Sequence, residues 1–293
     1  MPASPYVVAD VFTDVPLQGN PVAVFTDAAG LDAEVMQRVA RELNLSETVF
    51  VVAAGDDPEC DAHIRIFTPA LELPFAGHPV LGTAFVLGEG HASDTVRLRC
   101  EAGVVSIELT RRDGRIVFGE MTQPVPTWTA FEHAAEVLAA VGVERSELPV
   151  DVYDNGPRHT YVCLPDEASV AALAPDITAL GRLGPVGISC FAADGAAVKT
   201  RMFGPGLGVP EDPATGSAAG PLAVHLARHG VIGFGDRVEI RQGAEIGRPS
   251  VLHARANGTA DRVDEVIVGG AAVVVAQGEL RLPEVRDEAR RAG

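Results

Sequence analysis

The sequence predicts an α+β protein made of two similar lobes, each a mostly antiparallel β-sheet or barrel wrapped around a central buried helix. Two observations carry this prediction. The segment Arg65–Pro74 (RIFTPALELP) returns in changed form as Arg201–Pro210 (RMFGPGLGVP), and each copy leads into a glycine-led helix start of small residues, at Gly77 and at Gly216. A repeat of about half the chain length indicates two lobes that face each other across a site.

We place the boundary between the lobes near residue 123, because Pro124 and Pro126 interrupt the chain there. The N-terminal lobe then covers residues 1–123 and the C-terminal lobe residues 124–293, with the last residues free to return to the N-terminal lobe. A chain of 293 residues accommodates two domains of ordinary size, each with its own core. The charged tail from Glu284 is expected to be a frayed end.

The elements of the first half follow from periodicity and capping. Residues 6–12 and 21–25 alternate apolar and polar side chains on either side of a turn, which predicts a β-hairpin. Asp32 is placed to cap a helix that continues to about Leu43 with an apolar stripe. A second helix, from His78 to about Leu87, is apolar nearly all round and is therefore expected at the centre of its lobe. Further strands are predicted at residues 48–52, 63–67, 95–100, 104–109 and 115–119.

The second half repeats this order of elements. A helix is predicted over residues 166–183, with a break near Pro175, and a second buried helix runs from Gly216 to Gly230. Strands are predicted at residues 151–153, 161–164, 186–192, 197–203, 238–241, 250–256 and 265–276. The duplication therefore covers whole lobes.

The composition argues against several classes of partner. A formal net charge of −17 argues against nucleic acid, because such binding relies on clustered Lys and Arg. The longest stretch between charged residues, Leu73–Gly88, is too short to span a bilayer, so no membrane partner is expected. The first residues lack the basic and apolar segments of a secretory signal. We therefore expect a cytoplasmic protein.

The cysteines and histidines give no sign of a disulfide framework or a metal site. The four cysteines are widely spaced without a paired motif, and the eight histidines form no His-Glu-x-x-His pattern. Reduced thiols are expected, and no metal is predicted.

The two glycine-led helix starts are candidates for a binding site. If the pseudo-symmetry brings the helices at Gly77 and Gly216 head to head, their unpaired backbone N–H groups point into one cleft. Such N–H groups bind carboxylates without basic side chains, which makes a small anionic metabolite the expected partner of an acidic protein. The alternative is that the glycines only allow each buried helix to pack closely.

Five short motifs are spread along most of the chain: GNPVAVF at 19–25, LSET at 45–48, FAGHP at 75–79, DPATGSA at 212–218 and GRPS at 247–250. These motifs resemble the signatures of the PhzF-like phenazine biosynthesis family, whose members share the two-lobed diaminopimelate epimerase-like fold. They occur in the family's order, so the resemblance is specific for the family and weak for the substrate.

The resemblance implies a site and an activity. Glu47 becomes the general acid/base, and His78 and Asp212 hold the substrate and assist the proton transfer. The best-known activity of the family is isomerisation of trans-2,3-dihydro-3-hydroxyanthranilate, typically by homodimers without a cofactor. The residues expected to bind the substrate are Ser46, Gly77, Thr215, Gly216 and Ser217.

The residues themselves agree with such chemistry. Glu47 lies between a helix end and an apolar strand, where burial raises a carboxyl pKa above about 4.3. His78 at a helix N-terminus is expected to be neutral, and Asp212 beside Glu47 is able to share a proton or orient a substrate amine. Without the resemblance, a surface Glu, a capping His and a turn Asp remain the ordinary interpretations.

Differences between the two copies indicate the type of reaction. Diaminopimelate epimerase-like enzymes use one cysteine from each lobe, but the corresponding positions here are Ala76 and Thr215. The second copy has no match for Glu47. A single base favours an isomerase that moves a proton along one face of a conjugated acid. An amino-acid epimerase or cyclase using the same site, and a non-catalytic small-molecule binding protein, remain alternatives.

Three arginines are conspicuous beside these motifs. Arg65 and Arg201 occupy equivalent positions of the repeat, and structural ion pairs under the Pro-rich loops are favoured over carboxylate clamps. Arg248 is expected to contact a ligand or the other lobe.

Overall fold

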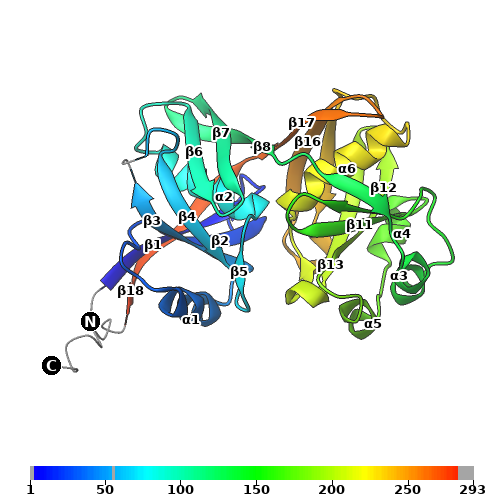
Figure 1. Ribbon diagram of the computed structural model, residues 1–293, viewed down its shortest axis with the longest axis horizontal. Coiled ribbons are helices and arrows are strands. Elements are labelled where there is room, and N and C mark those ends of the chain that lie inside the picture. The colour runs from blue at the N-terminus through cyan, green and yellow to red at the C-terminus, as the bar shows by residue number, and fades with distance from the viewer. Residues whose placement is uncertain (1–2, 55–56, 283–293) are drawn as a thin grey trace.

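The computed structural model describes residues 3–54 and 57–282, and shows two lobes side by side (Figure 1). In each lobe a curved sheet surrounds one helix, α2 (Gly77–Gly88) or α6 (Gly216–Arg228). The expected frayed tail from Glu284 lies outside the described residues. Within the described part of the chain, every helix is too short or too polar to cross a membrane.

The N-terminal lobe begins with the hairpin predicted from the sequence. Asp32 caps α1 (Ala33–Leu43) as expected, because its Oδ1 accepts a hydrogen bond of 2.8 Å from the Val35 amide. The strands of this lobe are β1 (Ala3–Val11), β2 (Asn20–Phe25), β3 (Glu47–Ala54), β4 (Ala62–Phe67), β5 (Glu72–Leu73), β6 (Thr95–Cys100), β7 (Gly103–Arg112) and β8 (Arg115–Gln123).

The C-terminal lobe repeats this plan with small additions. Its short helices are α3 (Ala134–Val141), α4 (Glu167–Ala171), α5 (Ile177–Gly181), and the 3₁₀ turns η1 (Pro205–Leu207) and η2 (Ala244–Ile246). Its strands are β9 (Thr127–Ala130), β10 (Asp151–Asp154), β11 (Arg158–Cys163), β12 (Gly187–Asp194), β13 (Ala197–Gly204), β14 (Val209–Asp212), β15 (Arg237–Gln242), β16 (Ser250–Gly258) and β17 (Val263–Gly270). The final strand, β18 (Ala272–Arg281), follows β17 after one residue.

The structure corrects one sequence prediction and bears out another. The single strand predicted over 265–276 is wrong, because the chain leaves β17 at Ala271 and continues in the other lobe as β18. The apolar residues continue without interruption from β17 into β18, so the sequence alone does not show that the strand ends at Ala271. The helix over 166–183 is confirmed as two short helices on either side of Pro175, and β9 and α3 were not predicted.

Strand pairing shows the duplication most directly. Most neighbouring strands are antiparallel, and each lobe contains two corresponding parallel pairs, β2–β3 and β4–β6 in the first and β11–β12 and β13–β15 in the second. Thr48 pairs with Phe67 and Ile188 with Phe203, the two Phe residues of the repeated motif. Position 47 in the first lobe therefore corresponds to position 187 in the second.

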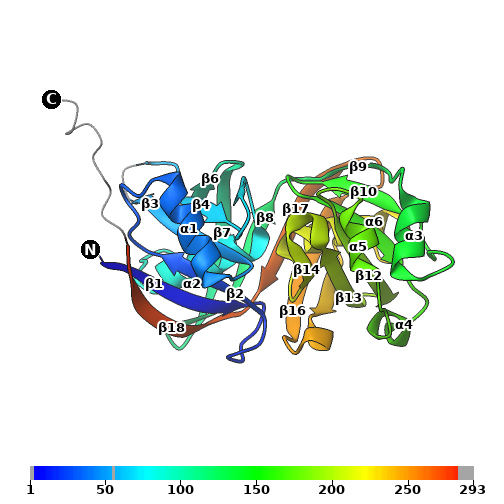
Figure 2. The same cartoon turned by 90° about the horizontal axis from the view of Figure 1, so that it is seen from below.

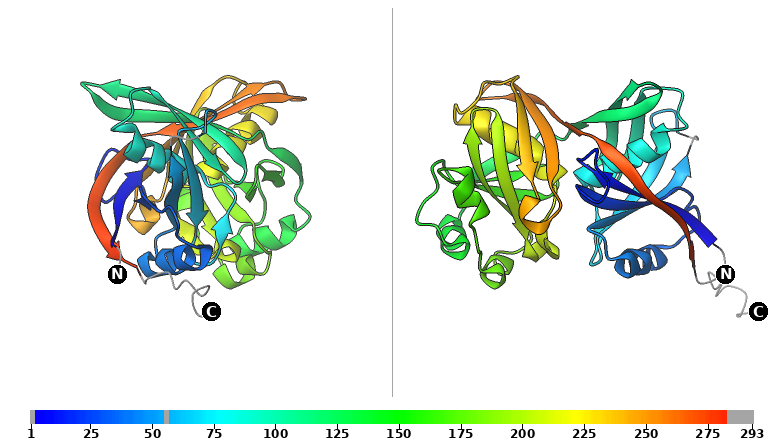
Figure 3. Two further views of the ribbon diagram at one scale, coloured as in Figure 1. Left: turned by 60° about the vertical axis from the view of Figure 1, so that its left-hand side comes forward. Right: turned by 180° about the vertical axis from the view of Figure 1, so that it is seen from behind.

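The lobes exchange their last strands. β8 pairs with β7 and with β17, so one sheet continues into the other. The chain then crosses, and β9 pairs with β10 of the second lobe while β18 returns to pair with β1 of the first (Figure 2). The right-hand view of Figure 3 shows the orange-red β18 running beside the blue β1. We propose that the lobes divide after Gln123, with β18 belonging structurally to the first.

The two central helices are buried because small residues face their sheets. A Cβ atom added to Gly82 of α2 would lie 2.6 Å from Val22 Cγ1, and one added to Gly220 of α6 would lie 2.5 Å from Val266 Cγ1. Both separations are too short for real atoms, so only glycine allows these helices to approach the sheet. All residues of α6 from Gly216 to Ala227 are buried.

Arg248 links the two lobes, as expected. Its Nη2 lies 2.7 Å from Asp10 Oδ1, and its guanidinium also donates to the carbonyls of Gly19 and Gln18 at 2.8 Å. Asp10 on β1 is only 1% exposed and also accepts from the Leu17 amide at 2.7 Å. The contact therefore neutralises a buried carboxylate with a cation from the other lobe.

Arg248→Ala should lower the free energy of unfolding by about 2–4 kcal/mol, because it leaves the Asp10 carboxylate buried without its cation. Urea denaturation measures this loss. Arg97→Ala is the matched control, since Arg97 is half exposed and lies 3.6 Å from Asp61, and it should cost about 0–1 kcal/mol. An equal loss in both variants would contradict the assignment.

Candidate active site

The N-termini of α2 and α6 meet between the lobes. A Cβ atom built on Gly77 would lie 2.8 Å from Gly216 C and from Ser217 N. One built on Gly216 would lie 3.1 Å from His78 N. Glycine at both positions is therefore needed for the helix ends to touch, and the partial positive charges of both termini converge on one place. The head-to-head geometry expected from the repeat is present.

Glu47 and His78 lie together at this meeting point. α1 ends at the left-handed Asn44 cap (φ 51°), a short turn follows, and β3 then starts at Glu47. The Oε2 atom of Glu47 lies 3.2 Å from Nε2 of His78. The two side chains are only 13% and 5% exposed. Neither atom makes an aligned hydrogen bond, and both are buried without another partner. Such contacts commonly align only when substrate is bound.

Asp212 reaches the same place from the C-terminal lobe. It ends β14, and its Oδ1 accepts from Asn20 Nδ2 at 2.8 Å while its Oδ2 accepts from Thr215 Oγ1 at 2.6 Å. Gln242 Nε2 donates to the Asp212 carbonyl at 2.8 Å and to Thr215 Oγ1 at 2.9 Å. The carboxylate is thus held by side chains from both lobes, and it is 7% exposed.

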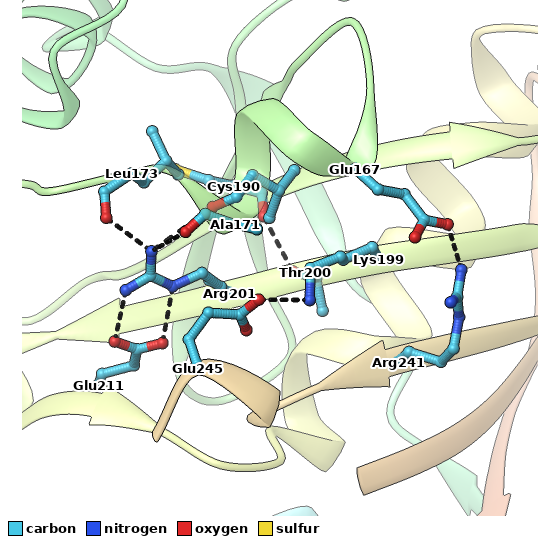
Figure 4. A network of polar contacts seen from close by, with 11 residues as sticks. Glu167, Ala171, Leu173, Cys190, Lys199, Thr200, Arg201, Glu211, Arg241 and Glu245 are labelled. Atoms are coloured by element: carbon cyan, nitrogen blue, oxygen red, sulfur yellow. Dashed lines mark hydrogen bonds and ion pairs between the residues drawn. The ribbon is translucent and has the colours of Figure 1, made fainter. Parts of the chain in front are cut away.

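An ion pair fixes the strand that carries Asp212. Figure 4 shows Arg201 between the Glu211 carboxylate and the carbonyls of Ala171 and Leu173. Arg201 Nε and Nη2 each lie 2.9 Å from a Glu211 oxygen, and Glu211 directly precedes Asp212. Arg65 and Glu72 make the corresponding bidentate pair in the first lobe at 2.7 Å. The prediction that both arginines form structural ion pairs is confirmed.

Burial dominates the protonation of the three groups. It raises the pKa of Glu47 well above its usual value, and the negative charge of Asp212 raises it further. Burial also raises the pKa of Asp212 to about 6, against the opposing hydrogen bonds from Thr215 and Asn20. The pKa of His78 falls to about 3, so its ring is neutral as expected. The main cause is burial, whereas the sequence argument had named the helix N-terminus.

The other predicted site residues surround this group. Ser46 is half-buried next to Glu47, and Gly77 and Gly216 form the helix contact. Thr215 and Ser217 are buried, and Ser217 Oγ lies 3.0 Å from His159 Nε2. Sequence reasoning missed Gln242 and His159, which no motif marks, and the role of Asn20, which lies within the GNPVAVF motif.

The start of α6 is held by side chains that satisfy its carbonyls. Pro221 cannot donate to the Ser217 carbonyl, and Asn155 Nδ2 donates to it instead at 3.0 Å. Gln123 Nε2 donates to the Gly216 carbonyl at 2.9 Å, and Tyr161 Oη donates to the Ala218 carbonyl at 2.7 Å. This helix end is therefore rigid.

Of the two equivalent strands, β3 places a carboxylate base, Glu47, at the site, whereas β12 starts with a glycine at the matching position. The register places Gly187 where the first lobe has Glu47. The arrangement suits proton transfer on one face of a bound molecule.

Possible metal ligands gather away from this site. Among the described residues, Asp57, Cys60 and His63 form one such group, and Asp151, His225 and His229 form another. In each, an arginine already binds the carboxylate: Arg99 at 3.0 Å from Asp57 and Arg228 at 3.2 Å from Asp151. A cation would have to displace that arginine.

Comparisons with known proteins agree with the geometry. Residues 9–278 match the PhzC-PhzF family of phenazine biosynthesis-like proteins. The chain is 51% identical over 278 residues to a trans-2,3-dihydro-3-hydroxyanthranilate isomerase of Pseudomonas chlororaphis, covering 94% of this chain and 99% of that one. It is 52% identical over 277 residues to the Pseudomonas aeruginosa isomerase of the same name, with the same coverage.

Solved structures confirm the predicted fold class. A PhzF-family phenazine biosynthesis protein of Bacillus anthracis superposes with a TM-score of 0.83 at 24% identity, covering 96% of this chain and all of that one. A hydroxyproline epimerase of Agrobacterium vitis shares the fold with a TM-score of 0.64 at 14% identity, covering 97% and 94% of the two chains.

The two buried carboxyls predict an unusual pH dependence of stability. Their raised pKa values mean that the folded state holds their protons more tightly than the unfolded chain does. This stabilisation is fully present below the unfolded pKa of about 4 and is lost as the pH rises through the folded values, about 6 for Asp212. Relative to wild type, Glu47→Gln should therefore gain unfolding free energy from pH 4 to pH 8.

Urea denaturation across this pH range measures the difference, with the exposed Glu132→Gln as control. Parallel stability curves for wild type and Glu47→Gln would show that Glu47 has an ordinary pKa.

Proposed function

Because the chain belongs to the PhzC-PhzF family of phenazine biosynthesis-like proteins, we propose that it isomerises trans-2,3-dihydro-3-hydroxyanthranilate by Glu47 acid/base catalysis. The chain is an isomerase of the PhzF type, as its identity of about half with these isomerases over nearly their full length requires. The observation that carries the mechanism is a single buried carboxyl, Glu47, which touches a neutral imidazole and whose pKa the nearby Asp212 charge raises.

Glu47 moves the proton. The raised pKa makes the acid form of Glu47 more accessible, so that the carboxyl is able both to take and to return a proton, as general acid/base catalysis requires. As a carboxylate it takes a proton from a ring carbon next to the conjugated double bonds, and the electron pair spreads over the conjugated system. As a carboxylic acid it returns the proton to another carbon on the same face. No atom is gained or lost, so an isomer results.

His78 orients the Glu47 carboxyl. His78 Nε2 lies 3.2 Å from Glu47 Oε2, and burial lowers the pKa of the ring to about 3, so the imidazole stays neutral. With its proton on the other ring nitrogen, His78 accepts a hydrogen bond at Nε2 from the Glu47 carboxyl while Glu47 is the acid.

Asp212 is suited to the substrate amine. An ammonium group placed beside Asp212 brings a positive charge close to Glu47. This charge lowers the pKa of Glu47, which the negative charge of Asp212 had raised. Binding of the correct substrate therefore generates the base. The carboxylate of the substrate fits the converging N–H groups of α2 and α6, with Ser46 and Ser217 beside them.

The remaining alternatives differ in their chemistry. Gly187 in place of a second carboxylate disfavours inversion by two bases on opposite faces, so an amino-acid epimerase is the less suitable assignment. A cyclase or a non-catalytic binding protein would use the same pocket, and the experiment below separates these outcomes.

Glu47→Gln should lower kcat on trans-2,3-dihydro-3-hydroxyanthranilate about 10²–10⁴-fold, because the amide cannot exchange the proton. In D₂O any deuterium that the wild type incorporates, through exchange of the Glu47 proton with solvent, should appear only at the carbon that receives the proton, as seen by NMR of the product. The exposed Glu34→Gln is the control and should retain wild-type rates. Deuterium exchange with inversion of an amino acid would instead identify an epimerase, and tight binding without turnover a binding protein.

We also propose that the protein acts as a homodimer. Two loops beside a cavity of about 1090 Å³ carry exposed apolar side chains, and Glu47, His78 and Asp212 do not line this cavity. Leu17 is 73% exposed, and Val15, Ile246 and Val251 are each more than 40% exposed. The loops touch, since the Gly19 amide donates to the Pro249 carbonyl at 3.1 Å. Charged residues such as Lys199, Arg241 and Glu245 line the cavity next to them. Exposed apolar side chains with polar residues beside them are typical of a subunit interface.

Leu17→Glu combined with Ile246→Glu should convert the dimer to monomer, measured by light scattering after size-exclusion chromatography. Val104→Glu, which changes an apolar residue of similar exposure (40%) outside this surface, is the control. A monomeric wild type, or a double variant that stays dimeric, would contradict this interface.

A further inference from the structure

His159 is a buried side chain that the mechanism above does not use. It lies on β11 of the C-terminal lobe, is 1% exposed, and its Nε2 is 3.0 Å from Ser217 Oγ. Its other ring nitrogen, Nδ1, is buried without a hydrogen-bond partner. A buried imidazole with a single polar contact, directed at a residue of the site, calls for a physical explanation.

The pseudo-symmetry places His159 beside Gly187, which is the counterpart of Glu47 in the second lobe. Val22 pairs with Glu47 in the first lobe, and His159 pairs with Gly187 in the second. Ser217 follows Gly216 as His78 follows Gly77. At these matching positions the first lobe therefore offers Glu47 and His78 to the site, and the second offers Ser217 supported by His159. The imidazole fills the space that the missing side chain at Gly187 leaves.

Gly187 determines which ring nitrogen carries the proton. A Cβ atom built on Gly187 would lie 2.6 Å from His159 Nδ1, so a Cα hydrogen of Gly187 points at that nitrogen. A proton on Nδ1 would collide with this hydrogen, whereas a lone pair accepts it as a weak C–H···N contact. This geometry favours a proton on Nε2, which would then be donated to Ser217 Oγ at 3.0 Å.

We propose that His159 is a positioning residue that fixes Ser217 as a hydrogen-bond donor to an anionic oxygen of the substrate. Ser217 Oγ accepts from His159, so its own O–H is left to donate into the pocket. Burial lowers the pKa of His159 to about 4, so the ring stays neutral and keeps this direction at physiological pH. The oxygen that Ser217 binds is an oxygen of the substrate carboxylate, or whichever substrate oxygen gains negative charge as the proton moves.

The identity of the substrate in this role rests on the function proposed above. The position of the proton on His159 rests on the geometry alone. A hydrogen bond to a charged oxygen typically contributes more than one between neutral groups, and donation from His159 polarises the serine further. Loss of the imidazole should therefore cost about 10-fold to 100-fold in kcat/KM, all of it through Ser217.

A double-mutant cycle tests the route through Ser217. His159→Ala and Ser217→Ala should each lower kcat/KM about 10-fold to 100-fold, and the double variant should be within about threefold of Ser217→Ala. His159→Gln, whose amide N–H can replace Nε2–H, should recover most of the loss. Losses that multiply in the double variant would overturn the proposal, and so would a His159→Gln variant that folds normally and is as slow as His159→Ala. His133→Ala, on the surface, is the control.

A second measurement needs no substrate. In ¹⁵N-histidine-labelled protein, long-range ¹H–¹⁵N correlation spectra distinguish the two neutral tautomers. His159, assigned by loss of its signal in His159→Gln, should carry its proton on Nε2 between pH 6 and pH 8. A proton on Nδ1 would overturn the proposal even if turnover is confirmed.

Dissociation constants for anthranilate, a stable aromatic amino acid with the same carboxylate, allow the same cycle without turnover. If the wild type fails to isomerise dihydrohydroxyanthranilate, the proposed function fails, while non-additive binding losses and an Nε2 proton would still support the role of His159. Additive binding losses would overturn that role.

Discussion

The contact between the N-termini of α2 and α6 is the constraint on which the rest of the structure depends. Because Gly77 and Gly216 have no side chains, two helix ends of like partial charge are pressed together at the centre of the molecule. Such an arrangement is unfavourable without an anion, and the protein surrounds it with Glu47 and Asp212. The burial that brings these groups together also raises their pKa values, so packing and acid/base chemistry have one cause.

Much of the fold was predictable from the sequence because local rules agreed with the global arrangement. The Asp32 cap, the hairpin around residues 16–20 and the all-round apolar helices appear as expected. The corner at Ala271 was not predictable, since β17 and β18 read as one apolar strand and only tertiary pairing separates them. β9 was missed because prolines at 124 and 126 suggested a linker where the chain crosses to β10.

The site was predictable to different degrees for different residues. Glu47, His78 and Asp212 lie in motifs, and the structure brings them into one buried group whose roles remain proposals. His159 and Gln242 lie in ordinary strand sequence, and their importance arises from register, which places them beside Ser217 and Thr215. Duplication explains both results, because each lobe kept the backbone plan while the side chains at matching places diverged.

The exchange of β9 and β18 has a consequence for the history of this architecture. Each lobe completes its sheet with a strand covalently attached to the other, so neither half as it stands would have a closed sheet. A single-lobe ancestor could fill that edge only by borrowing the same strand from an identical neighbour. With both copies joined in one chain, the side chains at matching positions are free to differ, as Glu47 and Gly187 do.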